Sequence, residues 1–83
     1  MITATRTILD CIGNTTLMPL RHVVPSNGAR VFLKLESENP TGSMKDRMAA
    51  TLVARAADDG RLPAGGTVVE YTAGSTGISL AFV

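Results

Sequence analysis

Cysteine and aromatic residues are scarce in this chain of 83 residues, which has one Cys, one Tyr, two Phe and no Trp. Because Cys11 is alone, no internal disulfide can form and no zinc site can be assembled. We expect Cys11 to be a buried structural thiol rather than a reactive one. These absences predict no bound metal and a reducing cytoplasm as the location.

An excess of one charge and a long apolar run are also missing. The formal net charge is +1 and the eight basic residues are scattered, so neither nucleic acid nor an anionic membrane is expected as a partner. No apolar run approaches the ~20 residues that span a bilayer. The first residues lack the basic-then-apolar order of a secretory signal. A chain of this length forms one small domain at most.

Two strand–loop–helix units follow one another along the chain. A strand over 31–36 precedes the loop 39–42 and a helix, and a strand over 67–71 precedes the loop 72–77 and a second helix. This order predicts an α/β fold with a parallel sheet, because helical crossovers join parallel strands. The shorter elements expected are helical turns over 7–12, an edge strand over 17–20 and a turn over 25–28.

The clearest helix begins at Ser43, whose hydroxyl can cap the first turn while Asp46 completes a capping box. Gly60 supplies its end. One face is an apolar stripe that we expect to pack in the core, made of Met44, Met48, Ala49, Leu52, Val53, Ala56 and Ala57. The run 78–83 stops without Gly, Pro or a polar tail, so we expect a longer protein of which this chain is the front part.

Both strand-to-helix loops are expected at the carboxyl ends of neighbouring parallel strands, where open α/β sheets bind ligands. Lys45 is unusual because it lies in the first turn of its helix, where the helix dipole disfavours the charged amine. A neutral amine can attack an aldehyde and form a Schiff base. Taken alone, such a lysine more often reaches into solvent.

The loop 72–77 contains three hydroxyls, two glycines and one alanine. Such residues let the backbone approach a ligand closely and donate hydrogen bonds to a carboxylate or phosphate. The spacing matches neither nucleotide-binding glycine fingerprint. A helix cap with small residues for close packing explains the same composition equally well.

Three motifs occur in order along the chain. They read Ile-Gly-Asn-Thr-Thr-Leu at 12–17, Asn-Pro-Thr-Gly-Ser-Met-Lys-Asp-Arg at 39–47 and Thr-Ala-Gly-Ser-Thr-Gly at 72–77. Together they resemble the N-terminal quarter of the cysteine synthase and cystathionine β-synthase family, which has the fold type II (tryptophan synthase β-like) architecture of pyridoxal-phosphate enzymes. The likeness covers nearly all of residues 1–83, which we therefore interpret as the N-terminal segment of such a domain, with the remainder absent.

The resemblance implies a role for each site residue. Lys45 would hold pyridoxal 5′-phosphate covalently and then act as base for the substrate α-proton. Thr72, Gly74, Ser75 and Thr76 would bind the substrate carboxylate, and Ser75 would also contact the cofactor. The implied reaction replaces the β-substituent of an activated serine by sulfide or a thiol, which makes cysteine or a related thioether amino acid. The complete protein would be a homodimer.

Two residues of the third motif depart from the family pattern, with Ser75 in place of the usual Asn and Ala73 in place of the usual Ser. These changes leave the exact substrate and nucleophile open. We expect Asp46 and Arg47 to brace the helix rather than to react. The family's glycine-rich phosphate loop is not found, so the isolated chain is expected to be inactive. The alternatives are a serine/threonine dehydratase, a threonine-synthase-like enzyme, a non-catalytic truncated product and a generic binding module.

Overall fold

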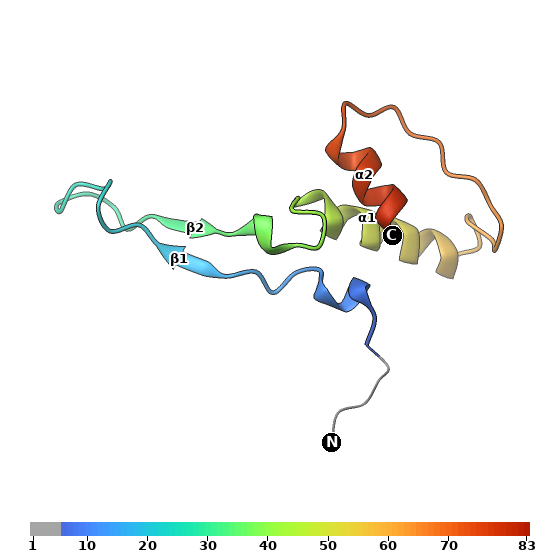
Figure 1. Cartoon of the computed structure of the whole chain (residues 1–83), viewed down its shortest axis with the longest axis horizontal. Helices are drawn as coiled ribbons and strands as arrows, with labels where there is room; N and C mark the ends of the chain where they lie inside the picture. The colour runs from blue at the N-terminus through green and yellow to red at the C-terminus, as the bar shows by residue number, and fades with distance from the viewer. Residues whose placement is uncertain (1–5) are drawn as a thin grey trace, which may run out of the picture.

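The computed structural model describes residues 6–83, so residues 1–5 of the expected domain lie outside the described part. The elements in chain order are η1 (Ile8–Cys11), β1 (Leu17–Pro19), β2 (Phe32–Lys34), η2 (Glu36–Glu38), α1 (Lys45–Asp58) and α2 (Ser75–Phe82). A long hairpin extends from one end and the two α-helices lie at the other (Figure 1). The radius of gyration is 17.1 Å, against about 12 Å for a compact domain of this length. The chain is therefore elongated.

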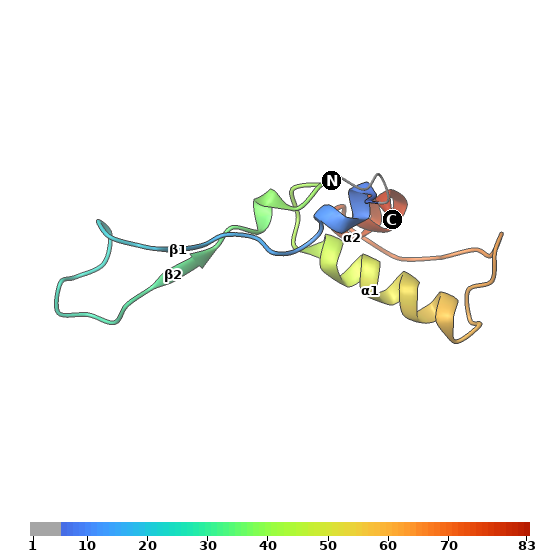
Figure 2. The same ribbon diagram turned by 90° about the horizontal axis from the view of Figure 1, so that it is seen from below.

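The hairpin consists of β1 and β2, which pair antiparallel with Leu17 opposite Lys34 and Pro19 opposite Phe32. A proline is tolerated here because both strands are edges. In the connecting turn, the N–H of Gly28 donates to the carbonyl of Pro25 at 3.0 Å. The edge strand and the turn predicted from the sequence are thus confirmed, as are the helical turns of η1. The turned view in Figure 2 shows the hairpin projecting away from the helices.

The predicted parallel sheet is not formed within residues 6–83, whose only sheet is the antiparallel β1–β2 pair. The strand expected over 31–36 is shortened to β2, and the segment 67–71 has no strand hydrogen bonds. A strand exists only through bonds to a neighbouring strand, and none of the described residues supplies one for this segment. Val69 and Tyr71 are consequently 89% and 100% exposed.

Helix α1 begins at Lys45, two residues later than expected. The Ser43 hydroxyl still serves the helix start, because its oxygen accepts the N–H of Lys45 at 3.0 Å. The predicted capping box is wrong, since the Asp46 carboxylate accepts the N–H of Thr41 at 2.8 Å and does not reach back to Ser43. The helix end is as predicted, with Gly60 in the left-handed region at φ 81°.

The core of the described residues is small and mostly polar. Ala49 is its only buried apolar residue, and the buried polar residues are Thr15, Asn39, Asp46 and Ser79. The prediction that the whole apolar stripe of α1 is buried is wrong, because α2 is the only helix or strand within residues 6–83 that packs extensively against α1, and Met44 and Leu52 remain 57% and 52% exposed. Cys11 is exposed, contrary to expectation. Neither helix in the described part is long and apolar enough to cross a membrane.

Candidate functional site

Lys45 is the first residue of α1, and its side chain is half-buried. Within residues 6–83 its amine has no hydrogen-bond or ion-pair partner. The amine of Lys34, by contrast, donates to the carbonyl of Thr15 at 2.5 Å. The Lys45 amine is therefore available for a covalent bond to an aldehyde.

The neighbouring Asp46 carboxylate is fully buried and accepts three hydrogen bonds. The N–H and hydroxyl of Thr41 donate at 2.8 and 2.5 Å, and the hydroxyl of Ser79 donates at 2.6 Å. Burial alone raises the pKa of Asp46, but the bonds from Ser79 and Thr41 outweigh it and lower that pKa below 3.8. The group is therefore an anion that joins the start of α1 to α2.

Sequence reasoning did not find the partners of Asp46. A signal for its burial was present, because Asp46 lies three residues before Ala49 and seven before Val53, on the same face of the helix. A carboxylate within a face that packs against another element needs donors from that element. The identity of Ser79 as that donor depends on how α2 packs and carries no local signal.

Arg47 joins the first two sequence motifs. Its Nε and Nη2 donate to the Glu36 carboxylate at 2.6 and 3.1 Å, and the hydroxyl of Thr15 donates to the same carboxylate at 2.5 Å. The bonds from Arg47 and then Thr15 are the main reasons that the pKa of Glu36 falls from 4.5 to about 2. The side-chain amide oxygen of Asn39 accepts the N–H of Gly13 at 2.9 Å. The expected bracing role of Arg47 is confirmed.

The third motif forms the start of α2. The Thr72 hydroxyl oxygen accepts the N–H of Gly74 and of Gly77, both at 3.1 Å, so Thr72 caps this helix. Ser75 is the first residue of α2, and Thr76 follows it. Among residues 6–83, the N–H groups of Ser75 and Thr76 have no partner. Two such donors at a helix start suit a carboxylate.

The two helix starts lie side by side. The Asp46–Ser79 hydrogen bond puts the first turn of α1 against the second turn of α2. Ser75 precedes Ser79 by four residues, which is about 6 Å along the helix axis. Lys45 and Ser75 are thus each about one helical turn or less from the same buried contact. All the site residues predicted from the sequence lie in this region.

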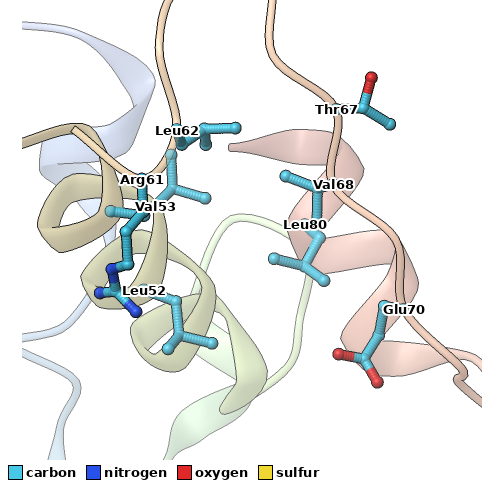
Figure 3. A pocket seen from close by; sticks show the side chains of 9 residues that line it. Leu52, Val53, Arg61, Leu62, Thr67, Val68, Glu70 and Leu80 are labelled. Carbon is cyan, nitrogen blue, oxygen red and sulfur yellow. The ribbon is translucent and has the colours of Figure 1, made fainter.

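Lys45 lines neither of two surface hollows beside the helices. One hollow of about 260 Å³ lies between the later turns of α1, the segment 61–70 and α2, where Leu52 and Leu62 face Val68 and Leu80 (Figure 3). A second, of about 270 Å³, reaches the loop at Thr72 and Gly77. The first is lined mainly by aliphatic side chains and holds no nucleophilic amine. Of the site residues predicted from the sequence, only Thr72 lines either of these two hollows.

Known proteins resemble nearly the whole chain. The protein family described as "Pyridoxal-phosphate dependent enzyme" matches residues 8–83. Cysteine synthase of Staphylococcus aureus (strain Mu50 / ATCC 700699) is 49% identical over 76 residues, covering 92% of this chain and 24% of that protein. The crystal structure of O-ureido-L-serine synthase matches with a TM-score of 0.85 at 43% identity, over 95% of this chain and 25% of that one. O-Acetyl Serine Sulfhydrylase isoform 3 from Entamoeba histolytica matches with a TM-score of 0.82 at 35% identity, over 99% and 27%. The chain thus spans about a quarter of the length of these relatives.

Proposed function

The chain belongs to the family of pyridoxal-phosphate dependent enzymes, and we propose that it supplies the cofactor lysine of a β-replacement enzyme. The proposed reaction makes cysteine, or a related thioether amino acid, from an activated serine and sulfide or a thiol. The observation that carries this proposal is that the Lys45 amine has no partner within residues 6–83, while the adjacent Asp46 joins α1 to the helix whose first N–H groups are also unpaired in that range. The names of the relatives, cysteine synthase and O-acetyl serine sulfhydrylase, support the same reaction class.

The residues of the chain fit the cofactor's chemistry. Lys45 offers a half-buried amine that no other group among residues 6–83 occupies, which is what covalent attachment of an aldehyde requires. When bound, pyridoxal phosphate supplies the electron sink for a carbanion at the substrate Cα. In this proposal the Lys45 amine holds the cofactor and, once released, takes the α-proton.

The start of α2 is proposed to bind the substrate carboxylate. The N–H groups of Ser75 and Thr76 are the donors, and Gly74 leaves the approach open because it has no side chain. The oxygen of the Thr72 hydroxyl already accepts two N–H groups, so its own proton is free to be donated outward. The Ser75 side chain, which is exposed, would reach the cofactor.

Completion of the fold is proposed to need further polypeptide. The exposed Val69 and Tyr71 are typical of a strand that lacks its neighbours, and we place segment 67–71 in a parallel sheet of the complete protein. Residues 1–83 alone are proposed to be inactive, because the described residues have one buried apolar side chain, Ala49. The complete enzyme is proposed to be a cytoplasmic homodimer that acts on an amino acid.

The test uses the complete protein that contains residues 1–83. It is expected to form cysteine from O-acetylserine and sulfide, and Lys45→Ala is expected to slow this at least about a hundredfold. Lys34→Ala is the matched control, because Lys34 is the chain's only other lysine. Full activity of the Lys45→Ala variant would refute the proposal. Release of a 2-oxo acid and ammonia from serine or threonine, without cysteine, would indicate a dehydratase. A gene that encodes nothing after Val83 would favour a non-catalytic product.

A further inference from the structure

Asp46 is the only fully buried ionisable side chain among residues 6–83. A buried carboxylate is costly unless its charge is compensated. No cation pairs with it in the described part of the chain, and its three donors are the uncharged groups of Thr41 and Ser79. An apolar residue would fill such a position at lower cost. Packing alone therefore does not explain this carboxylate.

The donors of Asp46 come from both sides of the candidate site. Thr41 lies in the loop before α1, and Ser79 lies in the second turn of α2, 33 residues along the chain from Asp46. Lys45 directly precedes Asp46, and the loop 72–77 leads into the helix that holds Ser79. One carboxylate thus joins the segment that contains Lys45 to the helix whose first N–H groups have no partner among residues 6–83.

We propose that Asp46 is a positioning residue that, through Ser79, holds the start of α1 against α2 and so sets the Lys45 amine relative to the loop 72–77. The inference rests on the proposed function and deepens it. A substrate that contacts both segments binds more tightly when they are already held at a fixed separation, because binding then does not have to order them. Two short hydrogen bonds, at 2.5 and 2.6 Å, on one carboxylate oxygen supply that rigidity.

The test compares four forms of the complete protein: wild type, Asp46→Asn, Ser79→Ala and the double variant. The KM for O-acetylserine is expected to rise about tenfold in each single variant, as for loss of a buried bond to a charged group, with kcat changed less than about threefold. The double variant is expected to lose less than the sum of the two single variants, because an uncharged amide at position 46 already weakens the bond that Ser79→Ala removes. The matched controls, exposed Asp58→Asn and Ser26→Ala, are expected to leave KM unchanged.

A second readout does not need the cofactor. Amide hydrogen exchange over residues 45–47 and 75–79 is expected to be about tenfold faster in Ser79→Ala than in wild type. Unchanged exchange and KM in this variant, or additive effects in the double variant, would overturn the proposal. If Asp46→Asn does not fold, Ser79→Ala decides, because it keeps the carboxylate and both Thr41 bonds. A wild type that makes no cysteine refutes the proposed function, while the exchange rates still decide the coupling.

Discussion

Gly77 lies so close to Thr72 that the effect of replacing Gly77 by alanine is expected to depend on the side chain at position 72. A Cβ added at Gly77 would lie 2.6 Å from the Cγ2 methyl of Thr72, a separation that real Cβ atoms essentially never show. Relief requires Thr72 to rotate, and rotation moves the hydroxyl that accepts the N–H groups of Gly74 and Gly77. The Cβ and Oγ1 atoms of Thr72 lie 3.7 Å from the added Cβ, which is ordinary contact. We therefore expect Gly77→Ala to uncap α2.

The magnitude follows from two opposing effects. Loss of the Thr72 cap costs about 0.5–2 kcal/mol, whereas alanine in place of glycine within a helix gains up to about 1 kcal/mol. Thr72→Ser keeps the hydroxyl and removes the methyl group that clashes. Gly77→Ala is thus expected to be neutral to destabilising beside Thr72 and stabilising in the Thr72→Ser background. The difference between the two backgrounds is expected to equal the cost of the lost cap, about 0.5–2 kcal/mol.

Denaturant unfolding of the complete protein in all four combinations measures this difference. Hydrogen exchange at the backbone amides of positions 74 and 77 reports the cap itself, and it is expected to quicken only when Gly77→Ala is made with Thr72 retained. The explanation is refuted if Gly77→Ala has the same effect with and without Thr72→Ser. It is also refuted if the substitution is harmless beside Thr72 and the two amides stay protected.

Two further changes test the segments around α1. Because the pKa of Glu36 is lowered from 4.5 to about 2, its ionised form stabilises the fold above pH 4.5, and this contribution is lost as the pH falls toward 2. Glu36→Gln is expected to flatten the acid side of the stability–pH curve, whereas exposed Glu70→Gln is not; equal curves would contradict this. Gly60 has φ 81° and open space around it, so Gly60→Ala is expected to lower the free energy of unfolding by about 1–2 kcal/mol, and Gly60→Asn by less. Thermal unfolding measures both changes. Unchanged stability in Gly60→Ala would show that this backbone angle relaxes freely.

Local signals were enough to predict the helices and the turn. Gly60 and the small residues 72–77 mark where α1 ends and α2 begins, and Pro25 and Gly28 mark the hairpin turn. The parallel sheet was beyond local reasoning, because segment 67–71 has the composition of a strand but no neighbour among residues 6–83. The prediction that the apolar stripe of α1 is buried was wrong for the same reason. Hydrophobic periodicity identifies an apolar face of a helix but does not specify which element covers it.

The candidate site was only partly predictable. The order of three motifs led to Lys45 and the loop 72–77, and both lie at adjacent helix starts. The cap formed by Thr72 could have been inferred from its place before two glycines. The bond from Ser79 to Asp46 could not, because it joins residues 33 apart through helix packing that the sequence pattern does not specify.

The assignment of Lys45 is tested most directly by locating the cofactor in the complete protein. Borohydride reduction in the presence of pyridoxal phosphate, followed by peptide mass mapping, fixes any lysine–cofactor adduct at its residue. The adduct is predicted on Lys45 and not on Lys34, whose amine donates a hydrogen bond to the carbonyl of Thr15. An adduct on Lys34, on a lysine outside this chain, or on no lysine at all would contradict the central claim.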